Sequence, residues 1–260
     1  MVSECFTQSG RPVRQSNAVA GGILKVNSKF LNWFTLLRAR DRRAPVLRAA
    51  VLAVTQLAAG TTVMAAEPLF IGQFSAQDLD DWQEKKFSDA TRYRLVQLDA
   101  ATVLAAESKR SASGLVRRIR IDLHRYPWLN WRWRIEERLD SRDEKTRSGD
   151  DYAARLYVIA SGGLVFWNTR AVNYVWARQS DRGEAWPNAF AGDKAMMLAL
   201  RSGADSTGTW YSEKRNVRED FRALHGTDIR YIDAVALMTD TDNGAGHALS
   251  YYGDIFFSSE

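Results

Sequence analysis

Apolar and polar residues alternate in short runs through most of the chain from about Leu69 onward. A period of two places successive side chains on opposite faces, which is the pattern of a half-buried β-strand. In the clearest run, LNWRWRIEERL, one face carries Trp131, Trp133 and Ile135, and the other face carries charged residues. The pattern therefore predicts strands, with little room for long helices.

Gly, Asp, Asn and Ser residues separate these runs, which recur at intervals of roughly eight to fourteen residues. That spacing is typical of all-β sandwiches and barrels. The expected strands are RYRLVQLDA, TVLAAES, GLVRRIRIDL, LNWRWRIEERL, YAARLYVIA, GGLVFWNT, AVNYVWAR, KAMMLALRSG and GTWYSEKR. We predict one β-sandwich domain over residues 66–260, decorated by one or two short helices.

One segment follows helical spacing instead. In NVREDFRALHG, Val217, Phe221 and Leu224 share one helical face, Asn216 can cap the N-terminus and Gly226 can end the helix. The helix leads into the strand IRYIDAVALMTD, and we expect LSYYGDIFF to pair with that strand. The polar residues between the two would then form the end of a hairpin.

The net charge of +5 comes from the first quarter of the chain. Residues 1–65 contain nine Lys or Arg and two Asp or Glu, whereas the rest contains 27 and 29. A basic leader does not indicate a nucleic-acid partner for the folded part.

Residues 37–65 have the features of a signal peptide. A flank with five Arg precedes the apolar run AAVLAVTQLAAG, and Val63 and Ala65 suit cleavage before Ala66. An amphipathic helix or a retained anchor is the alternative. Residues 1–36, with the single cysteine Cys5, are interpreted as a disordered extension that results from a misassigned start. We expect a cysteine-free mature domain in the periplasm of a Gram-negative bacterium, or secreted, with no stable membrane span.

Several motifs resemble a known family. YPWLNWRWRIEE, GDDYAARLYVIA, NYVWA, KRNVREDF, AVALMTDTDN and YYGDI are similar to the domain-of-unknown-function family numbered 3047, and the resemblance covers nearly all of residues 68–260. It implies an exported bacterial protein and supplies no activity. GDIFF is also similar to the last strand of galactose-binding-like jelly rolls, which include many carbohydrate-binding modules. This second likeness implies a jelly-roll-like β-sandwich.

The tryptophans offer candidates for a sugar-stacking platform. Trp128, just before a strand, is a candidate for an exposed position. Trp131 and Trp133 could also stack on a sugar, although core packing accounts for them better. Trp167, Trp176 and Trp186 divide in the same way. Trp167 and Trp176 are expected to be packed in strands, and Trp186 is expected in a loop.

Charged residues suggest a polar binding face. Arg132 and Arg134 share a strand face, and Arg155 follows Asp151 in a later strand. If those strands are neighbours, one face would carry alternating Arg and carboxylate groups that could bind a polyol or an anionic saccharide through guanidinium forks. A solvated face with weak ion pairs is the alternative.

A second basic group lies where a strand meets the predicted helix. Lys214, Arg215 and Asn216 could help the helix N-terminal amides hold an anion.

Asp240, Asp242 and Asn243 offer oxygen ligands of the kind that calcium prefers. The EF-hand pattern is absent, and a polar turn accounts for the same residues. We therefore expect no cofactor, with calcium as the alternative.

Enzyme signatures are weak. The three histidines lack zinc spacing, and there is no nucleophile elbow, P-loop or dinucleotide fingerprint. A hydrolase acting on polysaccharide or peptidoglycan could draw two carboxylates from Glu136, Glu137, Asp150, Asp151, Asp240 and Asp242.

The leading hypothesis is an exported, non-catalytic β-sandwich that binds a carbohydrate or another polar component of the cell envelope. A hydrolase and an envelope scaffold that binds another protein are the alternatives.

Overall fold

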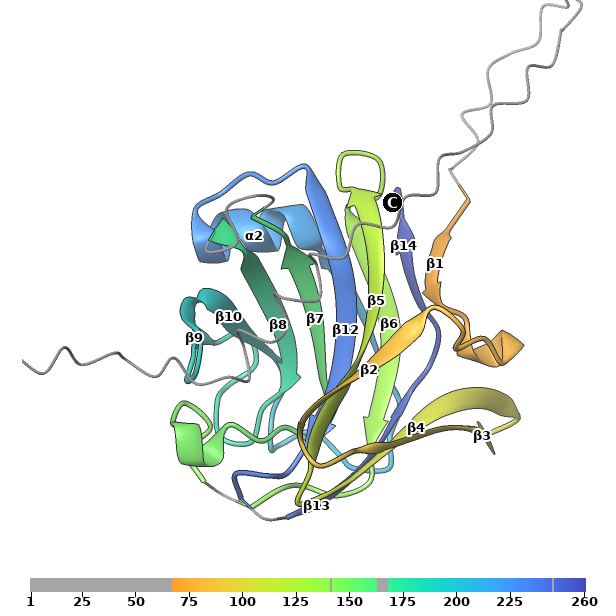
Figure 1. The fold of residues 1–260 in the computed structure, drawn as a ribbon, viewed down its shortest axis with the longest axis vertical. Helices are drawn as coiled ribbons and strands as arrows, with labels where there is room; N and C mark the ends of the chain where they lie inside the picture. The colour runs from red at the N-terminus through yellow and green to blue at the C-terminus, as the bar shows by residue number, and fades with distance from the viewer. Residues whose placement is uncertain (1–66, 141, 163–167, 245) are drawn as a thin grey trace, which may run out of the picture.

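A computed structural model describes residues 67–140, 142–162, 168–244 and 246–260. The predicted extension (1–36) and signal peptide (37–65), as well as Trp167, lie outside these residues. Two sheets of seven strands each make up most of the described part (Figure 1). Within it, no helix is long and apolar enough to cross a membrane. The predicted all-β, jelly-roll-like sandwich with a short helix is confirmed.

Sheet A is antiparallel and centres on β6, whose two edges both carry partners. One edge pairs with β11, and the other pairs with β14 and then with β13. Its strands are β1 (Leu69–Gly72), β14 (Ile255–Ser258), β6 (Trp128–Ile135), β13 (His247–Tyr252), β4 (Ala101–Lys109), β3 (Arg92–Leu98) and β11 (Tyr211–Asn216).

Sheet B is antiparallel except for the pair β8 and β10, which run parallel. In spatial order its strands are β2 (Trp82–Ser88), β5 (Ala112–Asp122), β12 (Tyr231–Asp240), β7 (Arg155–Ala160), β8 (Arg170–Trp176), β10 (Gly192–Arg201) and β9 (Ala185–Asn188). Two short 3-10 turns, η1 (Phe74–Ala76) and η2 (Arg147–Gly149), and the helix α2 (Val217–His225) complete the described elements.

Aromatic side chains from both sheets meet in the core. Trp131 and Trp133 of β6 are 2% and 0% exposed, and their rings lie 5.3 Å from Tyr174 and 6.0 Å from Trp176 of β8. Large buried rings contribute both apolar area and favourable ring geometry. The core interpretation of Trp131 and Trp133 is confirmed, and so is the packing of Trp176. The loop expectation for Trp186 is wrong because Trp186 is buried in β9.

The helix α2 has the ends that the sequence predicts. The Asn216 side chain accepts a hydrogen bond from the Glu219 amide at 3.2 Å. Gly226 has a φ of 63°, in the left-handed region that favours glycine, and its amide bonds to the Arg222 carbonyl. Phe221 is fully buried in the core and anchors the helix.

The expected hairpin between β12 and the following strand is wrong. β12 pairs with β5 and β7 in sheet B, whereas β13 pairs with β4 and β6 in sheet A. The segment 241–246 therefore crosses from one sheet to the other. Alternation fixes which face of a strand is buried, but both sheets share one core, so the pattern does not identify the neighbouring strand.

Candidate ligand-binding site

The outer face of sheet A carries the polar half of the β6 alternation. Residues 129, 131, 133 and 135 are buried, and residues 128, 130, 132 and 134 are partly exposed. Register places Asn130 opposite Lys214 and Arg132 opposite Ser212 on β11. Side chains directly opposite each other in antiparallel strands have Cβ atoms about 4.5–5.5 Å apart. These four residues therefore form a compact polar patch across two strands.

A bulge interrupts the other edge of β6 beside this patch. Tyr252 pairs with Trp133 and Phe256 with Asn130, so three residues on the β13–β14 side face two on β6. The Gly253 amide still bonds to the Arg132 carbonyl at 2.9 Å. An extra residue in one strand bends it and redirects the neighbouring side chains. Arg132, Asp254 and Phe256, which flank this bulge, line a pocket.

The resulting pocket has a volume of about 430 Å³. Most of its wall consists of outward-facing side chains of sheet A together with the 3-10 turn η1. The lining residues are Ser75, Thr102, Asn130, Trp131, Arg132, Ser212, Glu213, Lys214, Asp254 and Phe256.

The two acidic residues of this wall already have partners. Asp254 accepts hydrogen bonds from the Ser75 amide at 2.8 Å and from the Ser75 hydroxyl at 2.5 Å. The Glu213 side chain is buried and accepts from Arg201 Nε at 2.6 Å and from Trp133 Nε1 at 3.1 Å. The charge of Glu213 is therefore balanced by Arg201, whereas Asp254 keeps its negative charge, because Ser75 is uncharged.

Arg132 and Lys214 each lie over an indole ring. The Arg132 guanidinium carbon is 4.7 Å from the centre of the Trp210 ring, and Lys214 Nζ is 5.1 Å from that of Trp128. Among the described residues, neither cation has a hydrogen-bond or ion-pair partner. Rings hold the two side chains, and their two positive charges exceed the single negative charge of Asp254 in the pocket wall.

The other predicted residues of this region already have partners. Arg134 pairs with Glu136 at 2.6 Å and with Asp99 at 3.2 Å, and the hydrogen bond to Glu136 raises the pKa of Arg134. Arg215 forms a two-pronged pair with Asp220. Asn216 caps α2. These side chains fasten strands and the helix, so they have less to offer a ligand.

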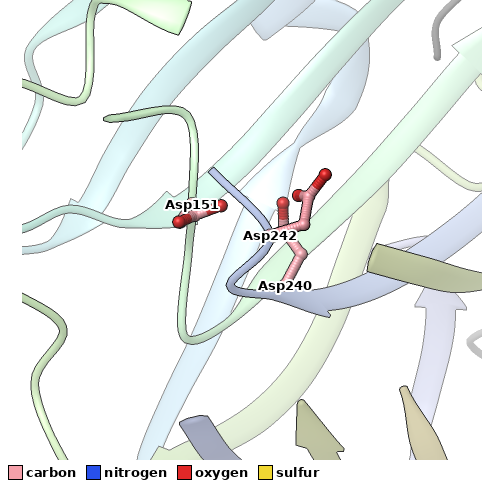
Figure 2. Close-up of side chains that lie close together, drawn as sticks. All are labelled: Asp151, Asp240 and Asp242. Atoms are coloured by element: carbon pink, nitrogen blue, oxygen red, sulfur yellow. The ribbon is translucent and has the colours of Figure 1, made fainter. Parts of the chain in front are cut away.

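A second polar region lies where the crossing segment leaves β12. Figure 2 shows Asp240 and Asp242 at the end of β12 facing Asp151, which precedes β7. Oxygen atoms from the three carboxylates lie within 4.8 Å of one another. Such a group has the ligand chemistry of a hard-cation site.

Arg155 forms ion pairs with Asp240 of this cluster and with the neighbouring Asp150. Its guanidinium lies 2.5 Å from Asp240 and 3.7 Å from Asp150, and its side chain is 4% exposed. Asp240 is fully buried. Burial raises the pKa of Asp240 well above its usual range, and although Arg155 opposes this rise, the carboxylates of Asp151 and Asp150 add to it.

Two backbone amides and one side-chain amide donate hydrogen bonds to the Asp151 carboxylate. It accepts bonds from the Asn243 amide at 3.0 Å, the Asn243 side chain at 3.0 Å and the Gly244 amide at 2.5 Å. These bonds attach the crossing segment to the turn before β7. A cation at this place would compete with Arg155 for Asp240 and with N–H donors for Asp151.

The predicted site residues thus divide between two places. Trp128, Arg132 and Arg134 lie in sheet A, whereas Asp151 and Arg155 lie in or next to sheet B. Because β6 and β7 belong to different sheets, the proposed shared face of Arg and carboxylate groups does not form. Of the carboxylates suggested for a hydrolase, Asp151, Asp240 and Asp242 form one cluster, whereas Glu136 pairs with Arg134 and Glu137 with His247.

Sequence reasoning missed Asn130 and Ser212 in the pocket wall, and it missed Trp210 and Gly253, which lie against the Arg132 side chain. The alternation in β6 could have found Asn130, since it shares a face with Arg132. Trp210 precedes β11 in a stretch where polar and apolar residues follow no periodic pattern. The sequence therefore gives no sign of its contact with Arg132.

Solved structures with a distant likeness include three carbohydrate-binding modules. The family 11 module of the cellulase Lic26A-Cel5E of Clostridium thermocellum is 10% identical, with a TM-score of 0.44, covering 76% of this chain and 97% of that one. The family 30 module of Cel9D-Cel44B, also of Clostridium thermocellum, is 10% identical with a TM-score of 0.40, covering 76% and 96%. TmCBM61, solved with β-1,4-galactotriose, is 11% identical with a TM-score of 0.38, covering 75% and 100%. Likeness at this level assigns no ligand to this chain.

The sequence itself gives a firmer relationship. A comparison with curated proteins found no match. The model of a family described as "Protein of unknown function (DUF3047)" matches residues 80–256, which is more than half of the chain. The resemblance noted from the motifs is thereby confirmed, and the chain belongs to the DUF3047 family.

Proposed function

We propose that this protein binds a carbohydrate, or a polar ligand of similar chemistry, in the pocket on the outer face of sheet A. The observation that carries the proposal is the pocket of about 430 Å³ lined by Asn130, Arg132, Ser212 and Lys214 beside the ring of Phe256. A sugar presents hydroxyl groups at its edge and C–H groups on its faces. Polar groups beside an apolar ring are therefore suited to bind it.

We propose further that the pocket binds without catalysis. Glycoside hydrolysis in most families needs two carboxyl groups that flank the scissile bond. In this pocket, the Asp254 carboxylate accepts hydrogen bonds from Ser75, and the Glu213 side chain points into the core toward Arg201. This arrangement supports a binding role over the hydrolase alternative.

The leader supports the proposal that the chain is exported to the periplasm or secreted. The proposed ligand is then a saccharide or another polar component of the cell envelope. Fractionation of Gram-negative cells that express the full chain with a C-terminal tag tests the location. Recovery of the tagged protein with cytoplasmic markers would contradict it.

The binding proposal is tested by calorimetry of the full chain against a panel of neutral and acidic oligosaccharides. We expect saturable binding to at least one class. Phe256→Ala should weaken it about tenfold, which is about 1.4 kcal/mol, by removing a ring from the pocket wall.

Tyr231→Ala is the matched control, since Tyr231 is a partly exposed aromatic residue of β12 on sheet B. It should leave affinity unchanged. Failure of every saccharide to bind, or an equal loss in both variants, would contradict a site on sheet A.

A further inference from the structure

Two cations without an ion-pair partner among the described residues line the sheet A pocket. Arg132 and Lys214 occupy diagonal positions across the β6–β11 pair, because Arg132 faces Ser212 and Lys214 faces Asn130. Diagonal neighbours of this kind are about 7–8 Å apart. That spacing is between backbone positions, and both long side chains line the pocket, so an anionic group bound there would be attracted by two positive charges. We infer that the saccharide bound in the pocket is acidic and that Arg132 and Lys214 select its anionic group; this inference rests on the proposed function.

The Arg132 side chain is held in place before any ligand arrives. Trp210 lies against its guanidinium, and Gly253 lies against its stem. A Cβ atom added at Gly253 would lie 2.5 Å from Arg132 Cγ and 2.6 Å from Nε. The bulge therefore needs glycine at this position so that Arg132 fits. An arginine whose rotamer is already fixed loses less entropy on binding and presents its planar fork to a carboxylate or sulfate.

The other charged residues near the pocket leave Arg132 and Lys214 as the groups that select an anion. Arg134 lies on the same face of β6, but Glu136 and Asp99 already balance it. The Asp254 carboxylate also lines the pocket and opposes an anion, although both of its oxygens accept bonds from Ser75. Among the described residues, the two cations are thus the charged side chains of the pocket wall that no hydrogen bond or ion pair engages.

Matched pairs of ligands test this inference. Calorimetry of the full chain would compare an oligogalacturonate with its carboxyl-reduced counterpart, and a dextran sulfate oligomer with plain dextran. The first pair tests a carboxylate and the second tests a sulfate. At least one acidic member should bind about tenfold or more tightly than its neutral counterpart, as expected for charge-assisted hydrogen bonds.

Variants then locate the contact. Arg132→Gln and Lys214→Gln should each remove most of the preference for the acidic member. Arg120→Gln and Lys86→Gln remove the same charges from exposed positions on β5 and β2 of sheet B, and they should retain the preference.

The outcomes separate this inference from the proposed function. Equal affinity for neutral and acidic members, weakened by Phe256→Ala, would keep the proposed function and overturn the inference. Loss of the preference in the sheet B controls as well would indicate nonspecific attraction of polyanions and would also overturn it. Failure of all four ligands, together with failure of the broader panel, would overturn both.

Discussion

Arg132 and Arg155 are both strand arginines, but their surroundings give them opposite roles. Arg155 is almost fully buried, and two carboxylates meet its charge. Arg132 is partly exposed, lies over Trp210 and has no anionic partner among the described residues. A buried guanidinium that is paired with carboxylates fastens the fold, whereas a partly exposed one without an ion-pair partner is available to a ligand. The difference comes from the groups that surround each guanidinium, and the residue type alone does not reveal them.

The largest expected effect tests the structural role of Arg155. Arg155→Ala should lower the free energy of unfolding by about 3–5 kcal/mol, because it leaves the buried Asp240 carboxylate without its partner. Arg132→Ala should change stability by less than about 0.5 kcal/mol, as is usual at such surface positions. Urea unfolding of the full chain measures both.

The double variant Arg155→Met/Asp240→Leu is the control. Removing both charges should recover most of the stability, since no unpaired ion stays buried. Similar stability losses in the Arg155 and Arg132 single variants would break the comparison.

Gly253→Ala tests whether Gly253 is required for the position of the Arg132 side chain. The added Cβ would collide with the Arg132 side chain, and overpacking of this kind costs about 1–3 kcal/mol. Ligand affinity should fall as well, because the guanidinium must move. In an Arg132→Ala background the same change should cost much less, and a double-mutant cycle of unfolding free energies measures the coupling. Additive costs would show that Arg132 is not what requires glycine.

Asn216→Ala separates a helix cap from a ligand contact. Loss of the cap should cost about 0.5–2 kcal/mol of stability and leave saccharide affinity unchanged. Asn216→Ser should restore stability, because serine also caps. A loss of affinity in a stably folded Asn216→Ser protein would return this residue to the site.

Calcium should have the smallest effect. Arg155 and the N–H donors of Asn243 and Gly244 already occupy the carboxylates of Asp240 and Asp151. We expect the melting temperature to be the same with calcium and with chelator. A ligand at one hundred times its dissociation constant adds about 2.7 kcal/mol, which is easily detected. A calcium-dependent rise that Asp242→Asn abolishes would make the cluster a metal site.

Most strands and the helix were predictable because their signals are local, but β1, β2 and β9 were not expected. Alternation placed Trp131 and Trp133 in the core, and the Asn216 and Gly226 positions marked both ends of α2. The pairing of β12 was not predictable, since β13 has the same alternation whether it joins the same sheet or the opposite one.

The candidate site was only partly predictable. Arg132 was identified correctly as an outward residue of β6, but the pocket depends on a mismatch between β6 and the β13–β14 edge. Such a mismatch becomes visible only when the register of two distant segments is known. Burial of Arg155 likewise depends on Asp240, which lies 85 residues away in the sequence.

The pairing of β1 with β14 has a consequence for the order of synthesis. Leu69 lies opposite Phe257, so the first strand of the described domain finds its partner only when the last strand has left the ribosome (Figure 1). Phe256, a wall of the pocket, arrives at the same moment. A chain still being made therefore has neither a paired β1 nor a complete pocket until the β14 residues have been added. Because both ends meet at one place, a circular permutant that joins them and opens elsewhere should still fold.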